Sequence, residues 1–241
     1  MSTNNPTQRG ICEFCGKRLE KMDLEFGGIV LYKGCGCEGA IAREREIMEA
    51  EEAKRREDEA RMREMRYRFA GIPRGYWEAE ADDGSLIDKI ERGEGLFFTG
   101  KSGRGKTYTA CSIARKLIER RWQVRFADVE TIEREVRSSW GSRETSEDDV
   151  IAKYVNADLA IIDDLGAEEM TPTTMKVLRA VVSGREANAA VTIFTSNYSR
   201  KEFAQHIARE SDPIMAQRFA SRIAGMTEVI EFTGEDRRLK R

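Results

Sequence analysis

The sequence predicts an α/β protein with a parallel β-sheet, preceded by a small cysteine-bearing module and a long charged helix. Three observations support this prediction. From residue 74 onward, short apolar runs alternate with helical patterns. Residues 40–69 contain neither Gly nor Pro and are rich in Glu and Arg, which is typical of an exposed helix. Four cysteines stand in two close pairs before residue 38. We therefore expect three parts: residues 1–39, 40–70 and 71–241.

Composition sets the class of protein. Of 241 residues, 40% are hydrophobic and 35% are charged, and the net charge of −2 gives no overall nucleic-acid footprint. There is no run of 18 apolar residues and no apolar core of a signal peptide near the start. We expect a cytoplasmic protein without a membrane span, whose five cysteines are metal ligands or thiols rather than disulfides.

The cysteine-bearing module predicts a zinc site. Cys12 and Cys15 are followed, after 19 residues, by Cys35 and Cys37, with a hairpin-like segment at residues 26–32 between the pairs. Four thiolates saturate tetrahedral Zn²⁺, so the metal would be structural. About 30 residues cannot stabilise themselves by burial alone, whereas zinc binding can. Free thiols or a redox pair are the alternative.

The charged stretch that follows predicts a helix over residues 40–69. Nine basic and nine acidic residues nearly cancel between residues 43 and 68, and several stand four apart in the favourable order. Its apolar positions are too sparse for a coiled coil. A solvated spacer is the favoured interpretation, a partner-binding helix the alternative. Gly71 and Pro73 should end it.

Five apolar runs are candidate strands of the parallel sheet, and several are continuously apolar, as expected for a sheet covered on both faces. They are residues 95–99, 123–127, 159–163, 191–196 and 227–232.

A glycine-rich loop follows the first of these strands and precedes a helical pattern. It consists of Gly100, Lys101, Ser102, Gly103, Arg104, Gly105, Lys106 and Thr107. This G-x-x-x-x-G-K-[ST] pattern, between a strand and a helix, predicts binding of the phosphates of a nucleoside triphosphate. Lys106 can reach the β- and γ-phosphates, and the Thr107 hydroxyl can ligate Mg²⁺. An ordinary glycine-rich turn is the alternative.

Two further strands end in polar side chains. The run 159–162 precedes Asp163 and Asp164, and the run 191–196 precedes Asn197. In a parallel sheet these residues would lie at the edge that carries the phosphate loop. Asp163 is then the expected Mg²⁺ partner, and Asp164 is placed to polarise the attacking water. Asn197 could orient that water. Taken alone, the two acids and Asn197 could equally form turns.

These segments resemble those of AAA+ ATPases of the bacterial helicase-loader group, the group of DnaC, DnaI and the IstB-like transposition helpers. The similar segments are residues 126–129, 161–166, 194–198 and 217–223, and the resemblance extends from residue 71 to residue 238. It implies a P-loop NTPase with five parallel strands in the order 5-1-4-3-2, binding ATP and Mg²⁺. With only 44 residues after Asn197, a helical lid domain is not expected.

The resemblance also implies roles for two arginines. In the group, the first acts as a finger on the nucleotide of a neighbouring subunit and the second senses the nucleotide; here these are Arg218 and Arg222. A finger acting in trans implies an oligomer. Exposed helix residues are the alternative. Asp164 departs from the Glu that many AAA+ proteins carry, so hydrolysis could be slow.

In loaders of this group, the helices after the second strand contact single-stranded DNA. The matching segment, residues 128–156, carries three arginines and one tryptophan: Arg134, Arg137, Trp140 and Arg143. They offer phosphate contacts and a stacking surface. The six acids of residues 133–149 stand against DNA contact, and the alternative is a solvated helical face.

The favoured hypothesis is an ATP-dependent loader of a replicative DNA helicase onto single-stranded DNA, with the zinc module docking the helicase. One alternative is an IstB-like helper ATPase that binds double-stranded DNA and a transposase. Another is an adaptor that binds ATP as a switch without useful turnover.

Overall fold

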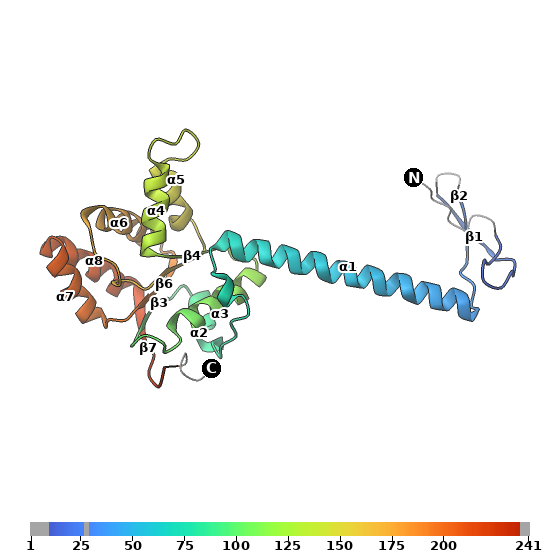
Figure 1. Ribbon diagram of the computed structural model, residues 1–241, viewed down its shortest axis with the longest axis horizontal. Helices are drawn as coiled ribbons and strands as arrows, with labels where there is room; N and C mark the ends of the chain where they lie inside the picture. The colour runs from blue at the N-terminus through green and yellow to red at the C-terminus, as the bar shows by residue number, and fades with distance from the viewer. Residues whose placement is uncertain (1–9, 27–28, 237–241) are drawn as a thin grey trace. The chain divides into compact units, whose positions relative to one another are not determined.

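The computed structural model describes residues 10–26 and 29–236 (Figure 1). The chain divides into two compact units, Met1–Met62 and Arg63–Arg241. Helix α1 (Glu38–Ala70) begins in the first unit and ends in the second. The last two turns of α1 thus belong to the same unit as the large sheet.

The first unit contains the expected hairpin. Strand β1 (Lys21–Phe26) pairs antiparallel with β2 (Ile29–Tyr32). An isolated bridge between Ile11 and Arg18 closes the preceding loop. The hairpin and the loop together bring the two cysteine pairs toward each other, although 19 residues separate them in sequence.

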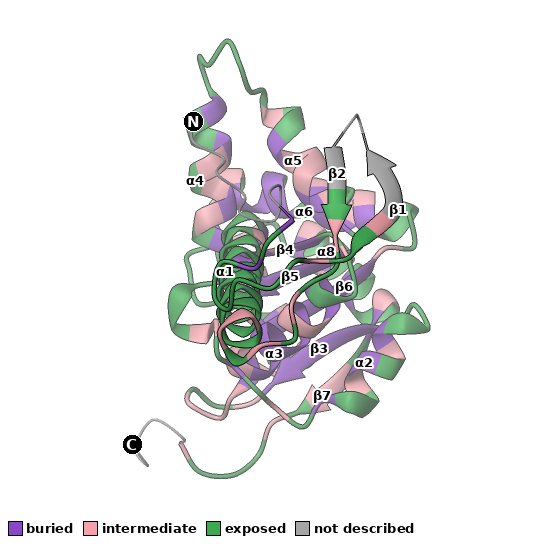
Figure 2. Ribbon diagram, turned by 90° about the vertical axis from the view of Figure 1, so that its right-hand side faces the viewer, coloured by how far each residue is buried: buried purple, intermediate pink, exposed green. Residues whose placement is uncertain are grey.

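Helix α1 is exposed over most of its length, as Figure 2 shows. Oppositely charged residues spaced by four positions were expected to pair along this helix, and Glu52 and Arg56 form such an ion pair at 2.7 Å. The end of the helix differs, because Tyr67 is buried in the second unit. Gly71 ends α1 with a left-handed backbone (φ +86°), and a Cβ there would lie 2.3 Å from the Phe126 carbonyl oxygen. The expected helix is therefore confirmed, with a final turn anchored beside strand β4.

The second unit is built on a five-stranded sheet with all strands parallel, in the order β4-β5-β6-β3-β7. Numbered along this unit alone, that order is 2-3-4-1-5, which is the expected 5-1-4-3-2 seen from the other edge. The strands fall within one residue of the predicted positions: β3 (Gly95–Thr99), β4 (Val124–Asp128), β5 (Leu159–Asp163), β6 (Val191–Ser196) and β7 (Thr227–Glu231).

Helices cover both faces of this sheet, which explains the continuously apolar strands. Along β3, Phe97 packs into one core, while Leu96 and Phe98 pack into the other. The first core is closed by α4 (Val129–Ser139), α5 (Glu147–Val155), α6 (Pro172–Ala187), α7 (Arg200–Glu210) and α8 (Pro213–Met226). The second is closed by the end of α1, the turn η2 (Arg74–Tyr76), α2 (Gly84–Glu91) and α3 (Lys106–Glu119).

Because all five strands are parallel, their carboxyl ends meet at one edge of the sheet. The phosphate loop, the two acids after residue 162 and Asn197 all follow such ends. Nowhere in the described ranges is there a helix both long and apolar enough to cross a membrane.

Candidate functional site

The phosphate loop connects β3 to α3 and packs against the segment that follows β7. Phe232 donates its N–H to the Thr99 carbonyl at 2.7 Å, and Arg104 donates to the Phe232 carbonyl at 3.3 Å. Gly100 has φ +137°, and a Cβ there would lie 2.3 Å from the Phe232 oxygen. Only glycine fits this close approach. The segment that follows β7 therefore fixes the conformation of the phosphate loop.

Lys106 begins α3 and is buried, with only 6% of its surface exposed. Its ammonium group donates to the carbonyls of Gly100 (2.6 Å) and Lys101 (3.1 Å) and to Oδ1 of Asn197 (2.9 Å). A buried ammonium group requires such acceptors. Lys106 and Asn197, 91 residues apart, are therefore in direct contact.

Asp163 lies at the end of β5 and faces Thr107 at the start of α3. The Thr107 hydroxyl lies 3.0 Å from Oδ1 and 3.2 Å from Oδ2 of Asp163, and the Thr195 hydroxyl donates to Oδ1 at 2.6 Å. Burial raises the pKa of the Asp163 carboxyl, and the two hydroxyl groups oppose that rise by stabilising the anion. Thr107 and Asp163 present hard oxygen donors side by side, which suits Mg²⁺.

Asp164 turns away from the strand with a left-handed backbone, φ +51°. Its Oδ1 accepts a hydrogen bond from Nδ2 of Asn197 at 3.0 Å, while Oδ1 of the same amide holds Lys106. One amide therefore joins the phosphate-loop lysine to the second acid. The four predicted residues Lys106, Asp163, Asp164 and Asn197 belong to one hydrogen-bonded network, completed by two threonine hydroxyls.

Thr195 is a member of this network to which the sequence prediction assigned no role. In the register of β5 on β6, Ile162 lies opposite Phe194, so the next pair along the strands is Asp163 and Thr195. The sequence feature that could have identified Thr195 is a polar residue near the end of an apolar strand. That strand is the neighbour, in the sheet, of the strand that carries the two acids. Using it requires knowing which strands are neighbours.

The two arginines with predicted roles, Arg218 and Arg222, both lie on α8. Arg218 is exposed. Arg222 donates to Glu186 at 2.6 Å and to Ser183 at 3.0 Å, both in the last turns of α6. That end of α6 leads into the start of β6, whereas the phosphate loop follows the end of β3. Arg222 is therefore not brought to the phosphate loop of the same chain.

The predicted DNA segment forms α4, α5 and the loop between them, which projects from the second unit (Figure 1). Two of its arginines pair within α4: Arg134 with Glu130 at 3.7 Å and Arg137 with Glu133 at 2.6 Å. Trp140 is 56% exposed in the loop, and Arg143 is exposed beside it. The loop therefore presents an aromatic ring and a cation, while the helix arginines already have acidic partners.

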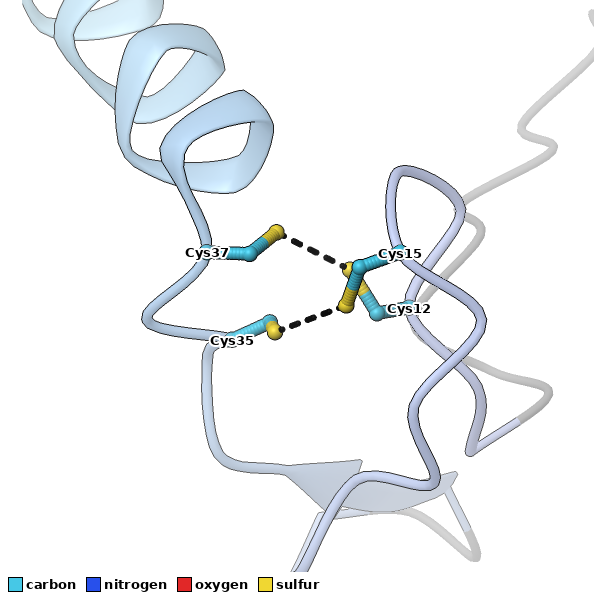
Figure 3. Close-up of side chains that lie close together, drawn as sticks. All are labelled: Cys12, Cys15, Cys35 and Cys37. Carbon is cyan, nitrogen blue, oxygen red and sulfur yellow. Dashed lines mark hydrogen bonds between the residues drawn. The ribbon is translucent and has the colours of Figure 1, made fainter.

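The four cysteines of the first unit converge, as Figure 3 shows. All four sulfurs lie within 4.8 Å of one another, with Cys12 and Cys37 at 3.7 Å and Cys15 and Cys35 at 3.4 Å. These spacings are too long for disulfides and close to the roughly 3.8 Å expected around tetrahedral zinc with Zn–S bonds of about 2.3 Å. The cluster thus fits a zinc ion.

The thiols within and outside the cluster differ in environment. Hydrogen bonds from the backbones of Cys15 and Phe14 lower the pKa of the Cys12 thiol to about 7, which favours the thiolate that binds metal. Within the same cluster, a backbone hydrogen bond from Cys37 lowers the pKa of Cys35, but hydrogen bonding to the Cys15 thiol and burial outweigh it and raise that pKa to about 12. Cys111, by contrast, is fully buried in α3 and its pKa is raised by desolvation. It is a small core residue.

The parallel sheet order, the glycine-rich loop and the paired acids define an α/β protein of the AAA+ P-loop class. The chain belongs to the family of IstB-like ATP binding proteins, whose pattern matches residues 43–241. Binding of ATP is the property that this family implies.

Individual relatives agree with this assignment. The replicative helicase loader DnaI of Bacillus subtilis is 30% identical over 152 residues, which cover 61% of this chain and 48% of that protein. An ATP-binding protein of insertion sequence IS5376 from Geobacillus stearothermophilus is 26% identical over 151 residues, covering 63% and 58%. The chain thus matches about half the length of these curated relatives.

Solved structures show the same fold. A crystal structure of DnaI superposes with a TM-score of 0.55 at 26% identity, covering 67% of this chain and 95% of that one. The chain is also similar to DnaC helicase loaders in sequence and in structure. The expected resemblance to the helicase-loader group is therefore confirmed.

Proposed function

We propose that this chain is an ATPase that loads a replicative DNA helicase onto single-stranded DNA. The observation that carries the proposal is the similarity to the replicative helicase loader DnaI, together with a four-cysteine module ahead of the ATP-binding fold. ATP would bind on the loop Gly100–Thr107, and the energy of binding or hydrolysis would change the affinity of the chain for helicase and DNA.

The network around Lys106 supports ATP hydrolysis. Thr107 and Asp163 would hold Mg²⁺, which neutralises charge on the transferring phosphoryl group when it is bound. Asp164 would polarise the attacking water and Asn197 would orient it, since one amide contacts both Asp164 and Lys106. Arg218, exposed on α8, would reach the nucleotide of a neighbouring subunit, and Arg222 would respond to nucleotide at the same junction.

The first unit supports a docking role. A groove of about 1120 Å³ runs beside the cysteine cluster. Its lining combines apolar side chains of the loop that carries Cys12 and of early α1 with the charged side chains of Glu13, Arg43, Glu44 and Glu46. Ile11, Phe14 and Met48 in this lining are 51%, 48% and 62% exposed. Exposed apolar side chains gathered around a groove are typical of a protein-binding surface. We propose that the helicase binds there.

Single-stranded DNA would contact the loop between α4 and α5. Trp140 offers a face for stacking on a base, and Arg143 offers a phosphate contact. The Arg134–Glu130 ion pair is exposed and therefore weak, so Arg134 can exchange Glu for phosphate. Arg137 is itself exposed, but its partner Glu133 is only 15% exposed. Unchanged affinity for single-stranded DNA in the double variant Arg137→Ala with Trp140→Ala would remove this part of the proposal.

The decisive test is binding to the replicative helicase of the host. We expect the chain to retain the helicase in a pull-down, and Phe14→Ser to weaken retention. Met62→Ser is the matched control, because Met62 is an exposed apolar residue of α1 that does not line the groove. Failure of the unaltered chain to bind the helicase, with and without ATP, would sink the loader proposal.

A second function has specific support. The chain belongs to the family of IstB-like ATP binding proteins, and an ATP-binding protein of an insertion sequence is among its relatives. A transposition helper would bind double-stranded DNA and a transposase instead of a helicase. Competition between single- and double-stranded DNA, measured with ATP, separates the two: preference for the duplex without helicase binding favours the helper.

A further inference from the structure

Thr195 occupies an unusual position for a hydroxyl group. It lies next to the last residue of β6 with only 1% of its surface exposed. A buried hydroxyl must have partners. The Thr195 hydroxyl donates to Oδ1 of Asp163 at 2.6 Å and accepts the N–H of Asp164 at 2.9 Å. A single hydroxyl group therefore contacts both acids.

The first of these bonds orients a carboxylate. The Thr107 hydroxyl from α3 bonds Oδ1 and Oδ2 of Asp163 at 3.0 and 3.2 Å, and the Thr195 hydroxyl from β6 bonds Oδ1 at 2.6 Å. Bonds from two different elements leave the carboxylate little freedom to rotate. Without Thr195, Asp163 would retain only the Thr107 hydroxyl among these partners, and that hydroxyl is itself an expected metal ligand.

The second bond secures a strained turn. Asp164 has a left-handed backbone, a conformation that non-glycine residues adopt at some energetic cost. Its N–H is held by the Thr195 hydroxyl, and the next N–H, of Leu165, donates to the Thr195 carbonyl at 2.7 Å. The turn aims the Asp164 carboxylate at Asn197. The direction of the second acid thus depends on Thr195 through both its side chain and its backbone.

We propose that Thr195 is a positioning residue that sets the carboxylates of Asp163 and Asp164 relative to each other through one hydroxyl group. This inference rests on the proposed ATPase function. Residues that orient metal ligands by hydrogen bonds typically account for about 10–100-fold in metal affinity or activity. Loss of the hydroxyl should therefore raise the Mg²⁺ concentration at which nucleotide binding is half-saturated. Its effect on the affinity for the nucleotide itself should be smaller.

The test compares three variants of the full chain. Thr195→Val keeps the shape and removes the hydroxyl, whereas Thr195→Ser keeps the hydroxyl. Thr192→Val is the matched control: Thr192 is also buried on β6, but its hydroxyl accepts from Arg185 at 2.8 Å at the start of the strand. Binding of a fluorescent ATP analogue is measured across a Mg²⁺ titration and in EDTA, and thermal melting of each variant is recorded.

For Thr195→Val, we expect the Mg²⁺ concentration at half-saturation to rise by about 10–100-fold, with affinity in EDTA unchanged. Thr195→Ser should titrate like the unaltered chain. Thr192→Val should melt earlier but keep the normal Mg²⁺ dependence. If the valine variant does not fold, Thr195→Ala replaces it in the same titration.

Two results would overturn the inference while leaving the ATPase proposal intact. One is a normal Mg²⁺ titration in Thr195→Val or Thr195→Ala. The other is a defect in Thr195→Ser as large as that of Thr195→Val, because the hydroxyl would then not be the cause. If the unaltered chain binds the nucleotide without any effect of Mg²⁺, the proposed ATPase fails, and this inference fails with it.

Discussion

Asn197 shows how much one side chain can do at the edge of a parallel sheet. Its amide has both a donor and an acceptor group, and the two point to different parts of the site. Oδ1 holds the buried Lys106 ammonium group and Nδ2 holds the Asp164 carboxylate. The Lys106 ammonium group and the Asp164 carboxylate are therefore joined through a single amide.

Replacing Asn197 tests this coupling. We expect Asn197→Ala to lower kcat for ATP hydrolysis by roughly 10²–10⁴-fold, the range for losing a positioned proton-transfer group, while nucleotide affinity changes little. Steady-state hydrolysis and equilibrium binding of an ATP analogue measure the two effects. Asn188→Ala is the control, since Asn188 is an exposed residue after α6. A kcat equal to that of the control variant would contradict the assigned role.

At the scale of elements, one buried arginine ties three of them together at the opposite edge of the sheet. Arg185 of α6 is 0% exposed and donates to carbonyls at the end of α5, including that of Tyr154 at 2.6 Å, and to the Thr192 hydroxyl of β6 at 2.8 Å. Desolvation lowers the pKa of its guanidinium group to about 10, so the group stays charged at neutral pH. Its several acceptors compensate that buried charge.

Removing this arginine should destabilise the second unit strongly. We expect Arg185→Met to lower the free energy of unfolding by at least about 3 kcal/mol, because several buried acceptors lose their donor at roughly 1–3 kcal/mol each. Urea unfolding followed by circular dichroism measures the change. Arg179→Met, on an exposed position of the same helix, should have little effect. Equal stability of the two variants would show that the buried network contributes nothing.

The cysteine module offers a second test at this scale. If zinc binds the four clustered thiols, a thiol reagent should label none of the five cysteines quickly in the native chain. A chelator should expose four of them, and Cys111 should react only on unfolding, because burial both hides its thiol and raises its pKa. Metal analysis should find one zinc per chain. Labelling of four thiols before chelation would contradict the zinc site.

Element boundaries were predictable to within a few residues, and the reason is local. Glycines, prolines and changes of hydrophobic period mark the ends of strands and helices, so β3, β5 and β6 begin and end at the predicted residues. The burial of the last turn of α1 was harder to predict from the sequence. A charged helix reads as solvated throughout, and the burial of Tyr67 and Ala70 depends on contacts with residues far along the chain.

At the scale of the whole molecule, the proposed nucleotide site would be shared between two chains. Lys106, Asp163, Asp164 and Asn197 form one network, but Arg218 lies exposed on α8, outside that network. An arginine finger supplied by a neighbour would complete the site. The exposed position of Arg218 is consistent with a shared, intersubunit nucleotide site.

Mixing two inactive variants tests this arrangement. Arg218→Ala and Lys106→Ala should each lose ATP hydrolysis, the first by about 10³–10⁵-fold if Arg218 is the finger. A mixture should regain part of the activity, because junctions form in which one chain supplies the intact loop and the other supplies Arg218. Hydrolysis is measured across mixing ratios, with each variant alone as the control. No gain at any ratio would exclude a finger acting in trans.

The sequence by itself determined the fold class and pointed to the phosphate loop, the two acids, Asn197 and the two pairs of neighbouring cysteines. Each of these is encoded by short-range patterns of residue type and spacing. The tertiary structure alone decided how they meet. The parallel order of strands brings Thr195 beside Asp163, buries Arg185 among three elements and separates Arg222 from the phosphate loop. Such contacts join residues tens of positions apart, and only the packing of strands and helices specifies them.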